Sequence, residues 1–251
     1  MMTQARDELG EWPWGVPVPP SGDELPCDDG EPMETELHAK QLSLTRDYAH
    51  VLLQGRGAYV AGNLAFYYSA VQARKLDFKA PDVMIFLDVE QRVRRSWVVW
   101  EEDGRVPAVV IELLSESTRA NDLGRKKNVY ERIGVRDYFV YDPLTAELRG
   151  WHLHDGRYQA LAADERGRLA SAALGVRLGV AEGTYEEVTG PWLRFFDAAG
   201  ELVPTAAEAE ARRADEQARR ADEQARRADE AERELAALRA RLAALEGGER
   251  R

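Results

Sequence analysis

Hydrophobic residues along the first two thirds of the chain follow first a helical spacing and then a strand-like one. From about residue 33 to 54 they recur at intervals near one helical turn, which predicts a helix. Short runs rich in β-branched and aromatic residues come next, and these predict strands. The runs are 58–70 (interrupted by Gly62), 83–89, 96–102 and 108–114.

A second alternation of helix and strand follows these runs. The spacing predicts a helix from Asp122 to Ile133, with Asp122 as its N-cap and Gly134 just past its end. A strand at 136–143 is stopped by a proline, and a hairpin turns at Asp155-Gly156. Further short β segments reach about residue 188. Mixed helices and strands indicate an α/β or α+β body with a mostly β C-terminal part.

The last segment carries a different pattern. The sequence ARRADEQ occupies 211–217 and again 218–224, and ARRADEA follows at 225–231. A seven-residue repeat predicts a helix with a continuous apolar seam, of alanines first and then of Leu235, Leu238, Leu242 and Leu245. A local break in the repeat separates the two halves. The seam predicts a coiled coil that joins copies of the chain, mainly through the leucine half, or docks a partner. The alternative is a single solvated helix held by its own ion pairs.

Charge and composition narrow the setting of the protein. The net charge is −11, of which the 46 residues from Ala206 onward carry 11 basic and 12 acidic groups, so the preceding body carries −10. An acidic body disfavours a broad phosphate-binding surface but permits a local basic strip. A lone cysteine, Cys27, and the lack of a long apolar segment predict a cytoplasmic protein without membrane contact. No Walker-type or GxGxxG motif supports a nucleotide-dependent enzyme.

Two carboxylates stand where predicted strands could bring them together. Asp82 directly precedes the run VMIFLDV, and Glu112 lies inside the apolar run AVVIELL. On adjacent strands both could bind one Mg²⁺ ion, with water and phosphate completing its shell. Separate structural roles are the alternative: Asp82 as a turn residue or cap, and Glu112 in an ion pair with an arginine.

A lysine that completes such a site has to come from another element. The simplest arrangement places it two residues after the glutamate, on the same strand face, but that position holds Leu114. The following helix offers Lys126 and Lys127, which point about 100° apart, so at most one faces the strands. Lys126 shares a helix face with Tyr130, and it is the inward candidate if Tyr130 packs on the sheet. In the alternative, both lysines lie on a solvated face.

These residues together resemble a known family. Pro81-Asp82-Val83 and the stretch 111–143 are similar to the Uma-type restriction endonuclease family, within the PD-(D/E)xK superfamily. The family pattern is met in register by Glu112, Ser115, Ser117, Thr118, Asp122, Lys126, Tyr130, Gly134, Asp142 and Pro143. The sequence departs from it at Glu116, where proline is usual, and at Asp137-Tyr138-Phe139, which replaces Glu-Tyr-Trp.

The resemblance implies a restriction-endonuclease-like core with a central mixed sheet flanked by helices. The predicted domains are an N-terminal arm at 1–23, the nuclease-like domain at 24–205, and the heptad helix at 206–251. Asp82 and Glu112 become metal ligands for Mg²⁺ or Mn²⁺, and Lys126 becomes the displaced catalytic lysine.

Further residues could support that site. They are Glu31, His38, Ser115, Asp122 and Tyr130 around the metal, and Arg119, Arg125 and Lys127 as contacts to DNA. The predicted function is a metal-dependent DNA endonuclease. A nuclease-fold protein with an idle site, acting through its coiled-coil tail, is the alternative.

Overall fold

The computed structural model describes residues 21, 35–74, 78–115 and 118–248, with side chains omitted for residues 74 and 241–248. Contacts divide the chain into two units, Met1–Val203 and Pro204–Arg251. The predicted arm at 1–23 lies outside the described residues except for Ser21. Within the described helices, none is long and apolar enough to cross a membrane.

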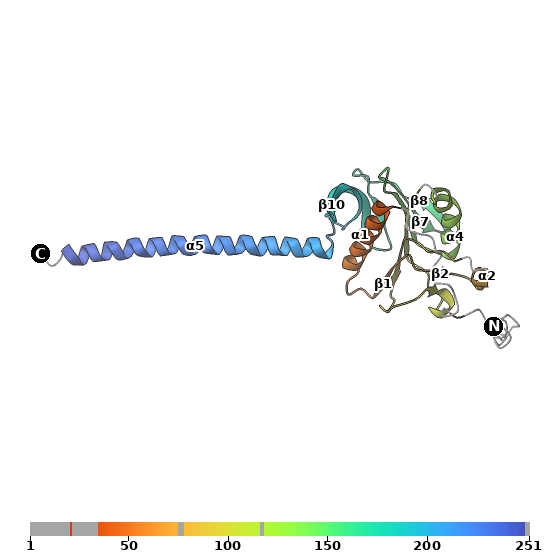
Figure 1. The fold of residues 1–251 in the computed structure, drawn as a ribbon, viewed down its shortest axis with the longest axis horizontal. Helices are drawn as coiled ribbons and strands as arrows, with labels where there is room; N and C mark the ends of the chain where they lie inside the picture. The colour runs from red at the N-terminus through yellow and green to blue at the C-terminus, as the bar shows by residue number, and fades with distance from the viewer. Residues whose placement is uncertain (1–20, 22–34, 75–77, 116–117, 249–251) are drawn as a thin grey trace. The chain divides into compact units, whose positions relative to one another are not determined.

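A six-stranded mixed sheet forms the centre of the first unit (Figure 1). Its strands, in spatial order, are β1 (Ala58–Gly62), β3 (Val83–Leu87), β5 (Val109–Leu113), β6 (Asp137–Asp142), β7 (Glu147–His154) and β8 (Arg157–Ala160). Only the β5–β6 pair is parallel, and all other neighbours are antiparallel. Parallel neighbours need a crossover, which here is the helical segment containing α3 (Arg119–Asn121) and α4 (Lys127–Ile133).

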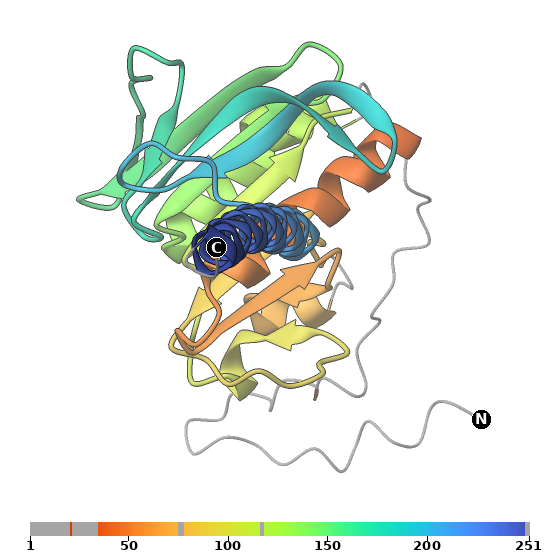
Figure 2. The same ribbon diagram turned by 90° about the vertical axis from the view of Figure 1, so that its left-hand side faces the viewer.

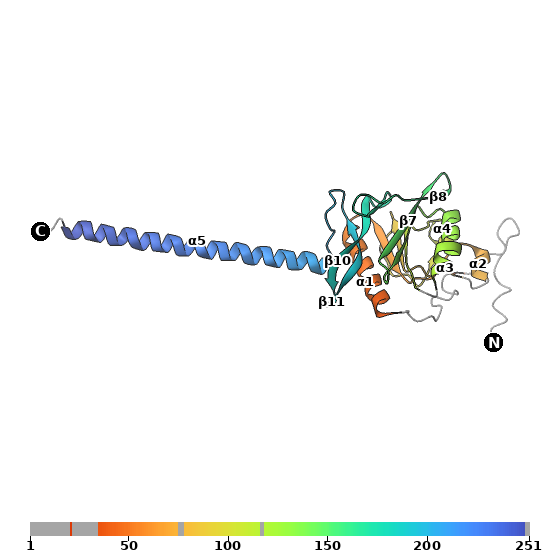
Figure 3. The same cartoon turned by 90° about the horizontal axis from the view of Figure 1, so that it is seen from above.

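Layers of helix and strand cover both faces of this sheet (Figure 3). One face packs on α1 (Glu36–Leu52) and on a three-stranded sheet of β9 (Leu169–Ser171), β10 (Val176–Tyr185) and β11 (Val188–Phe196). The other face packs on α4, with β4 (Trp97–Val98) and β2 (Phe66–Tyr67) nearby. Figure 2 shows α1 lying across the first face. The mixed α/β class predicted from the sequence is therefore confirmed.

Strand β5 shows how the pattern of side chains builds both cores. Val109, Ile111 and Leu113 point into the core beneath α1, whereas Val110 and Leu114 point into the core beneath α4. Successive side chains of a strand point to opposite faces. Position 112 therefore faces α4, and the buried glutamate there lies in an otherwise apolar layer.

Several local signals in the sequence correspond to the observed elements. Helix α1 begins after Thr35, whose hydroxyl accepts a hydrogen bond from the His38 amide at 3.1 Å. Gly134 ends α4 with a φ of 92°, which glycine adopts without strain. Asp155 and Gly156 turn the β7–β8 hairpin with φ of 48° and 74°. The helix predicted near 33–54 is confirmed over Glu36–Leu52. The predicted helix end at Gly134 and the hairpin at Asp155-Gly156 are confirmed as well.

Other runs are more broken than predicted. The run at 58–70 divides into β1 and the two-residue β2, and 96–102 holds β4 followed by a 3₁₀ turn at Val99–Glu101. A five-residue helix, α2 (Ala70–Arg74), follows β2. Parallel pairing of β2 with β4 forms a small separate sheet.

The expectation that Asp122 is an N-cap is wrong. Helical structure already begins at Arg119, and Asp122 has helical backbone angles of φ −66° and ψ −46°. It opens a π-helical turn, Asp122–Lys126, that leads directly into α4. Its carboxylate is buried and paired with a lysine, as described below, so the acidic residue serves a buried contact rather than the helix end.

The second unit is one long helix, α5 (Ala206–Gly248). Every side chain from Ala211 to Ala240 is exposed. Two ion pairs run along it, from Glu216 to Arg220 at 2.6 Å and from Glu223 to Arg227 at 2.5 Å. The predicted helix is therefore present, and whether it pairs with another helix stays a prediction.

Candidate active site

The register between β3 and β5 brings two carboxylates together. Val83 pairs with Ile111 in this antiparallel ladder, so continuing the ladder by one residue places Asp82 opposite Glu112. The contacts agree: the Leu113 amide donates to Asp82 Oδ2 at 2.7 Å, and the Asp82 amide donates to Glu112 Oε2 at 3.4 Å. Both residues lie at even-numbered positions, which on these two strands point toward α4.

Glu112 is buried and bound from two sides. The Tyr130 hydroxyl, on α4, donates to its Oε1 at 2.8 Å. The Lys126 ammonium lies 3.2 Å from its Oε2. A buried carboxylate needs such partners to be tolerated, and both come from the crossover that links β5 to β6.

The two neighbouring lysines point in different directions. Lys126 Nζ lies between two carboxylates, 3.2 Å from Glu112 and 2.7 Å from Asp122 Oδ1. Lys127 Nζ instead lies 4.4 Å from the centre of the Trp151 ring. The structure thus places Lys126, together with Tyr130, on the face directed at the strands.

Asp122 and Lys126 are the first and last residues of one π-helical turn. Such turns insert into α-helices and occur frequently at functional sites. Here the backbone carbonyl of Asp122 accepts a hydrogen bond at 2.9 Å from the Tyr138 hydroxyl, on β6. The turn is therefore tied to the sheet by a buried side chain as well as by the Asp122–Lys126 ion pair.

Asp82 is fixed by two donors. Its Oδ2 accepts the Leu113 amide, and its Oδ1 lies 3.1 Å from Nε2 of His38, on α1. The side chains of His38 and Asp82 are 11% and 13% exposed, so this corner is accessible while Glu112 is not. The site therefore draws residues from α1, β5 and the crossover, with Asp82 at the start of β3.

Burial and charge act against each other in this cluster. Burial raises the pKa of Glu112 to about 8; the Lys126 ammonium and the Tyr130 hydroxyl oppose that rise, and the carboxylates of Asp122 and Asp82 add to it. Burial likewise raises the pKa of Asp122. For Lys126, burial favours the neutral amine, but Glu112 and Asp122 outweigh it and raise the pKa above its usual range. The lysine stays charged, and Glu112 and Asp122 both pair with that one ammonium.

The donor set fits a hard divalent cation with few protein ligands. Among the described residues, no group of three or more His, Cys, Asp or Glu side chains is arranged to hold a metal. A cation here would therefore have the oxygens of Asp82 and Glu112 and would take its remaining ligands from water and substrate, which is usual for Mg²⁺. The excess of buried negative charge over Lys126 also favours a cation. Glu31, proposed as a further ligand, lies outside the described residues.

Comparison with known proteins identifies the family of the chain. The model of the Uma2 family, described as "Putative restriction endonuclease", matches residues 20–182, which is more than half of the chain. The chain belongs to the Uma2 family. No curated protein matches it. A solved structure with some likeness is "a putative nuclease belonging to DUF820" from Anabaena variabilis ATCC 29413, at 14% identity and a TM-score of 0.45. That match covers 63% of this chain and 91% of the other.

In this Uma2 protein the remaining predicted site residues are dispersed. Ser115 forms a hydroxyl–hydroxyl hydrogen bond of 2.9 Å with Thr118 at the start of the crossover. Arg119 pairs with Asp142 at the end of β6, and 39% of its side chain remains exposed. Lys127 covers Trp151, and Arg125 is exposed on the π turn. A DNA-binding role for the three basic residues stays a prediction.

Sequence patterns did not identify Tyr138 as part of the site. It lies in a buried strand, and the family pattern drew attention to it only as part of a departure. Nothing local in the sequence shows that its hydroxyl would meet the Asp122 carbonyl sixteen residues earlier, because that contact depends on how the crossover packs on β6.

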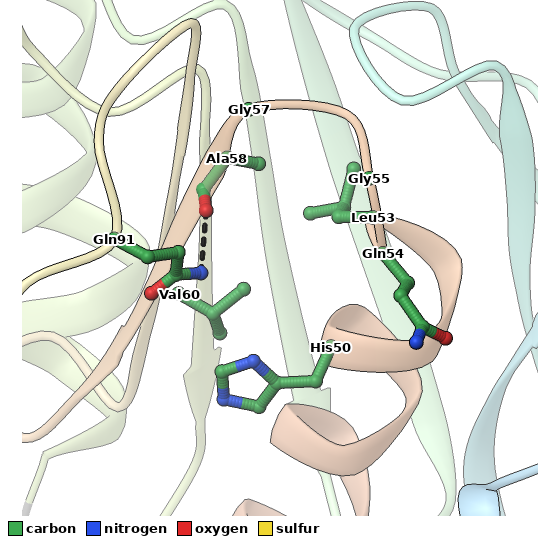
Figure 4. Close-up of a pocket in the computed structure, with 8 residues that line it drawn as sticks. All are labelled: His50, Leu53, Gln54, Gly55, Gly57, Ala58, Val60 and Gln91. Atoms are coloured by element: carbon green, nitrogen blue, oxygen red, sulfur yellow. Dashed lines mark hydrogen bonds between the residues drawn. The ribbon is translucent and has the colours of Figure 1, made fainter.

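A pocket in the first unit is separate from this site. It has a volume of about 420 Å³ and lies between the end of α1 and the start of β1, next to the loop that carries Gln91 (Figure 4). Gln91 donates a hydrogen bond to the Ala58 carbonyl, and burial lowers the pKa of His50. No lining residue of this pocket belongs to the carboxylate cluster.

Proposed function

We propose that this protein is a divalent-metal-dependent endonuclease that hydrolyses phosphodiester bonds in DNA. The observation that carries the proposal is the position of the Lys126 ammonium, 3.2 Å from Glu112, whose carboxylate also accepts the Asp82 amide. A pair of carboxylates on adjacent strands with one lysine is the set of groups that this hydrolysis needs. The description of the Uma2 family as restriction endonucleases supports DNA as the substrate.

Asp82 and Glu112 would hold Mg²⁺ or Mn²⁺. When bound, such an ion supplies Lewis-acid polarisation of a phosphoryl oxygen and lowers the pKa of a coordinated water. The Leu113 amide and His38 orient Asp82, and Tyr130 orients Glu112, so the chain fixes both carboxylates before substrate arrives.

Lys126 has the role of a fixed positive charge. Its ammonium is held by Asp122 and Glu112 and stays protonated, because the carboxylates raise its pKa despite burial. A charge already in place stabilises negative charge that develops on the phosphate during attack, without reorganisation at the moment of reaction. The same ammonium can donate a hydrogen bond that orients the attacking water.

A nicking experiment tests the proposal. Purified protein is incubated with supercoiled plasmid and Mg²⁺ or Mn²⁺, beside Glu112→Gln, Asp82→Asn and the control Lys127→Gln. At saturating DNA, where a weakened DNA contact does not limit the rate, we expect nicking by the wild type and the control, and loss in the two carboxylate variants. Equal nicking by all four proteins would reveal a contaminating nuclease and reject the assignment.

Inactivity needs a second measurement. If no protein nicks DNA, calorimetric titration with Mn²⁺ separates an unsuitable substrate from an idle site. Mn²⁺ binding that disappears in Glu112→Gln would retain the metal site and direct the search to other nucleic acids. Absence of Mn²⁺ binding would favour the alternative, a nuclease fold that acts only by binding partners.

A further inference from the structure

Leu235 and Leu238, in the leucine half of α5, form an apolar stripe that faces solvent. Leu235 is 48% exposed and Leu238 is 58% exposed, in a stretch where every described side chain is exposed. Large exposed aliphatic side chains at helical spacing mark a surface that contacts another helix. The charges that flank this stripe indicate which helix.

The stripe has its own heptad phase. Counting Leu235 as position a makes Leu238 position d, and the sequence repeats the pattern at Leu242 and Leu245. Ala228 and Ala231 are the a and d positions of the preceding heptad. About two and a half heptads therefore share one uninterrupted seam, after the phase break.

Charges in the alanine half are satisfied within one helix. Glu216 binds Arg220, and Glu223 binds Arg227, each four residues apart. The repeat also places Asp215 four residues before Arg219 and Asp222 four residues before Arg226. This half needs no second chain to balance its charge.

The leucine half is arranged differently. Arg239 has Leu235, Ala236, Leu242 and Ala243 at the positions three and four residues away, so no acidic residue shares its face. Arg241 likewise has only alanine and leucine at those positions. Glu234 lies four residues after another acid, Glu230. Within a single helix these charges are unfavourably placed or lack an opposite charge in reach.

A parallel, in-register pair of helices supplies the missing opposite charges. In that geometry position g of one helix lies beside position e of the next heptad on its partner. Glu234 at g then meets Arg239 of the partner copy, and Arg241 at g meets Glu246 of the partner copy. Arg227, which also binds Glu223 of its own helix, and Glu232 occupy the corresponding g and e positions one heptad earlier. All three g–e pairs join opposite charges.

We propose that the leucine half of α5 binds a second copy of this chain in parallel and in register, with the g–e charge pairs setting the orientation. This inference does not depend on the nuclease assignment. The seam is short, so the association depends on protein concentration. In the parallel pair each leucine layer joins two leucines, whereas the antiparallel arrangement that overlaps the whole seam from Ala228 to Leu245 sets two of its leucine positions against alanine.

Charge exchange distinguishes the two orientations. Glu234→Arg sets two arginines against each other in the parallel pair, and adding Arg239→Glu restores attraction there. In the antiparallel pair Glu234 would meet Arg241 and Arg239 would meet Glu232, so the double variant would remain repulsive at both contacts. Glu234→Arg also replaces a like-charge pair with Glu230 by an attractive one, so helix content does not fall for intrahelical reasons.

The experiment uses the full-length chain with Cys27→Ser and one new cysteine. Leu238→Cys places thiols of a parallel pair in the same layer, and the matched control Ala240→Cys places them on the outer face. The fraction of disulfide-linked dimer is measured in a glutathione buffer, which reports pairing of this helix even if the rest of the chain associates. Sedimentation equilibrium and circular dichroism accompany it.

We expect chains with Leu238→Cys to form the dimer in excess over the Ala240→Cys control. When Glu234→Arg is added to Leu238→Cys, the equilibrium constant for forming the disulfide-linked dimer should fall about tenfold. The further change Arg239→Glu should restore this constant. Helix content in both variants should be no lower than in the parent protein. Equal crosslinking at both cysteine positions would overturn the proposal. A charge-exchanged double variant weaker than Glu234→Arg alone would overturn the parallel orientation.

Discussion

Lys126 Nζ lies 3.2 Å from Oε2 of Glu112, although one residue is on a helical crossover and the other is inside a strand. The strand position that could have carried the lysine holds Leu114, which packs in the apolar core beneath α4. The crossover between two parallel strands must pack on the sheet face, so a residue on its inner side reaches the glutamate. A lysine on the helix therefore occupies the space that a lysine on the strand would have filled.

Replacing this lysine should affect both stability and activity. Lys126→Met leaves Glu112 and Asp122 buried without their counter-charge, so unfolding above pH 8 should become easier by about 3–5 kcal/mol. The rate of DNA nicking should fall by about 10²–10³. Chemical denaturation and initial nicking rates measure the two effects.

The adjacent lysine provides the control for that variant. Lys127→Met removes only the contact with Trp151, which is worth about 0.5–1 kcal/mol, and nicking should persist. A similar loss of nicking activity in Lys126→Met and Lys127→Met would show that activity requires positive charge anywhere on the crossover, and does not require the specific position of Lys126.

Stability of the metal-free protein should decrease as the pH rises from about 4.5 to about 8. Burial raises the folded-state pKa of Glu112 from 4.5 to about 8, so between these values the folded chain binds more protons than the unfolded chain. The free energy of unfolding then falls with pH, by at most about 1.4 kcal/mol per pH unit for one proton. Urea denaturation at several pH values in the presence of a chelator measures this slope.

Glu112→Gln isolates the contribution of that one carboxyl group. The amide does not titrate, so the free energy of unfolding of the variant should change less with pH between about 4.5 and about 8. The raised pKa of Asp122 leaves a smaller pH dependence in place. An unchanged slope in Glu112→Gln would contradict the assignment of the titration to Glu112.

Metal binding should show the opposite dependence on pH. A metal ligand must be deprotonated, so Mn²⁺ affinity should rise by up to about tenfold per pH unit below 8 and level off above it. Each binding event should release close to one proton at pH 6. Calorimetry in two buffers with different ionisation enthalpies counts that proton, and binding without proton release at pH 6 would place the cation elsewhere.

Much of the fold follows from local patterns in the sequence. Alternating side chains define β5, the capping position before α1 holds a threonine, and the left-handed end of α4 requires Gly134. The division of 58–70 and 96–102 into two-residue strands was not predictable in the same way. Whether β2 and β4 pair is decided by partners distant in the sequence, and aromatic runs look alike in either case.

The candidate site was predictable to a similar extent. Helical spacing from Tyr130 was sufficient to select Lys126 over Lys127, and alternation placed Glu112 on the same face. Asp122 was misassigned because an acidic residue at the start of a helical pattern has the same sequence signature whether it caps the helix or pairs inside the core. The π turn depends on a hydroxyl from β6, and no local pattern contains that contact.

That hydroxyl leads to the last prediction. Tyr138→Phe removes the hydrogen bond to the Asp122 carbonyl, so the π turn can relax toward a regular helix and carry Lys126 away from Glu112. The matched control is Tyr158→Phe, whose hydroxyl donates in the same way to the Val135 carbonyl at 3.0 Å but lies outside the π turn. Each loss should cost about 1 kcal/mol of stability.

Only Tyr138→Phe should also lower the nicking rate, by about tenfold, while Mn²⁺ affinity stays within a factor of about three, since Asp82 and Glu112 retain their other partners. Equal nicking rates in the two phenylalanine variants would show that the π turn holds its shape without Tyr138.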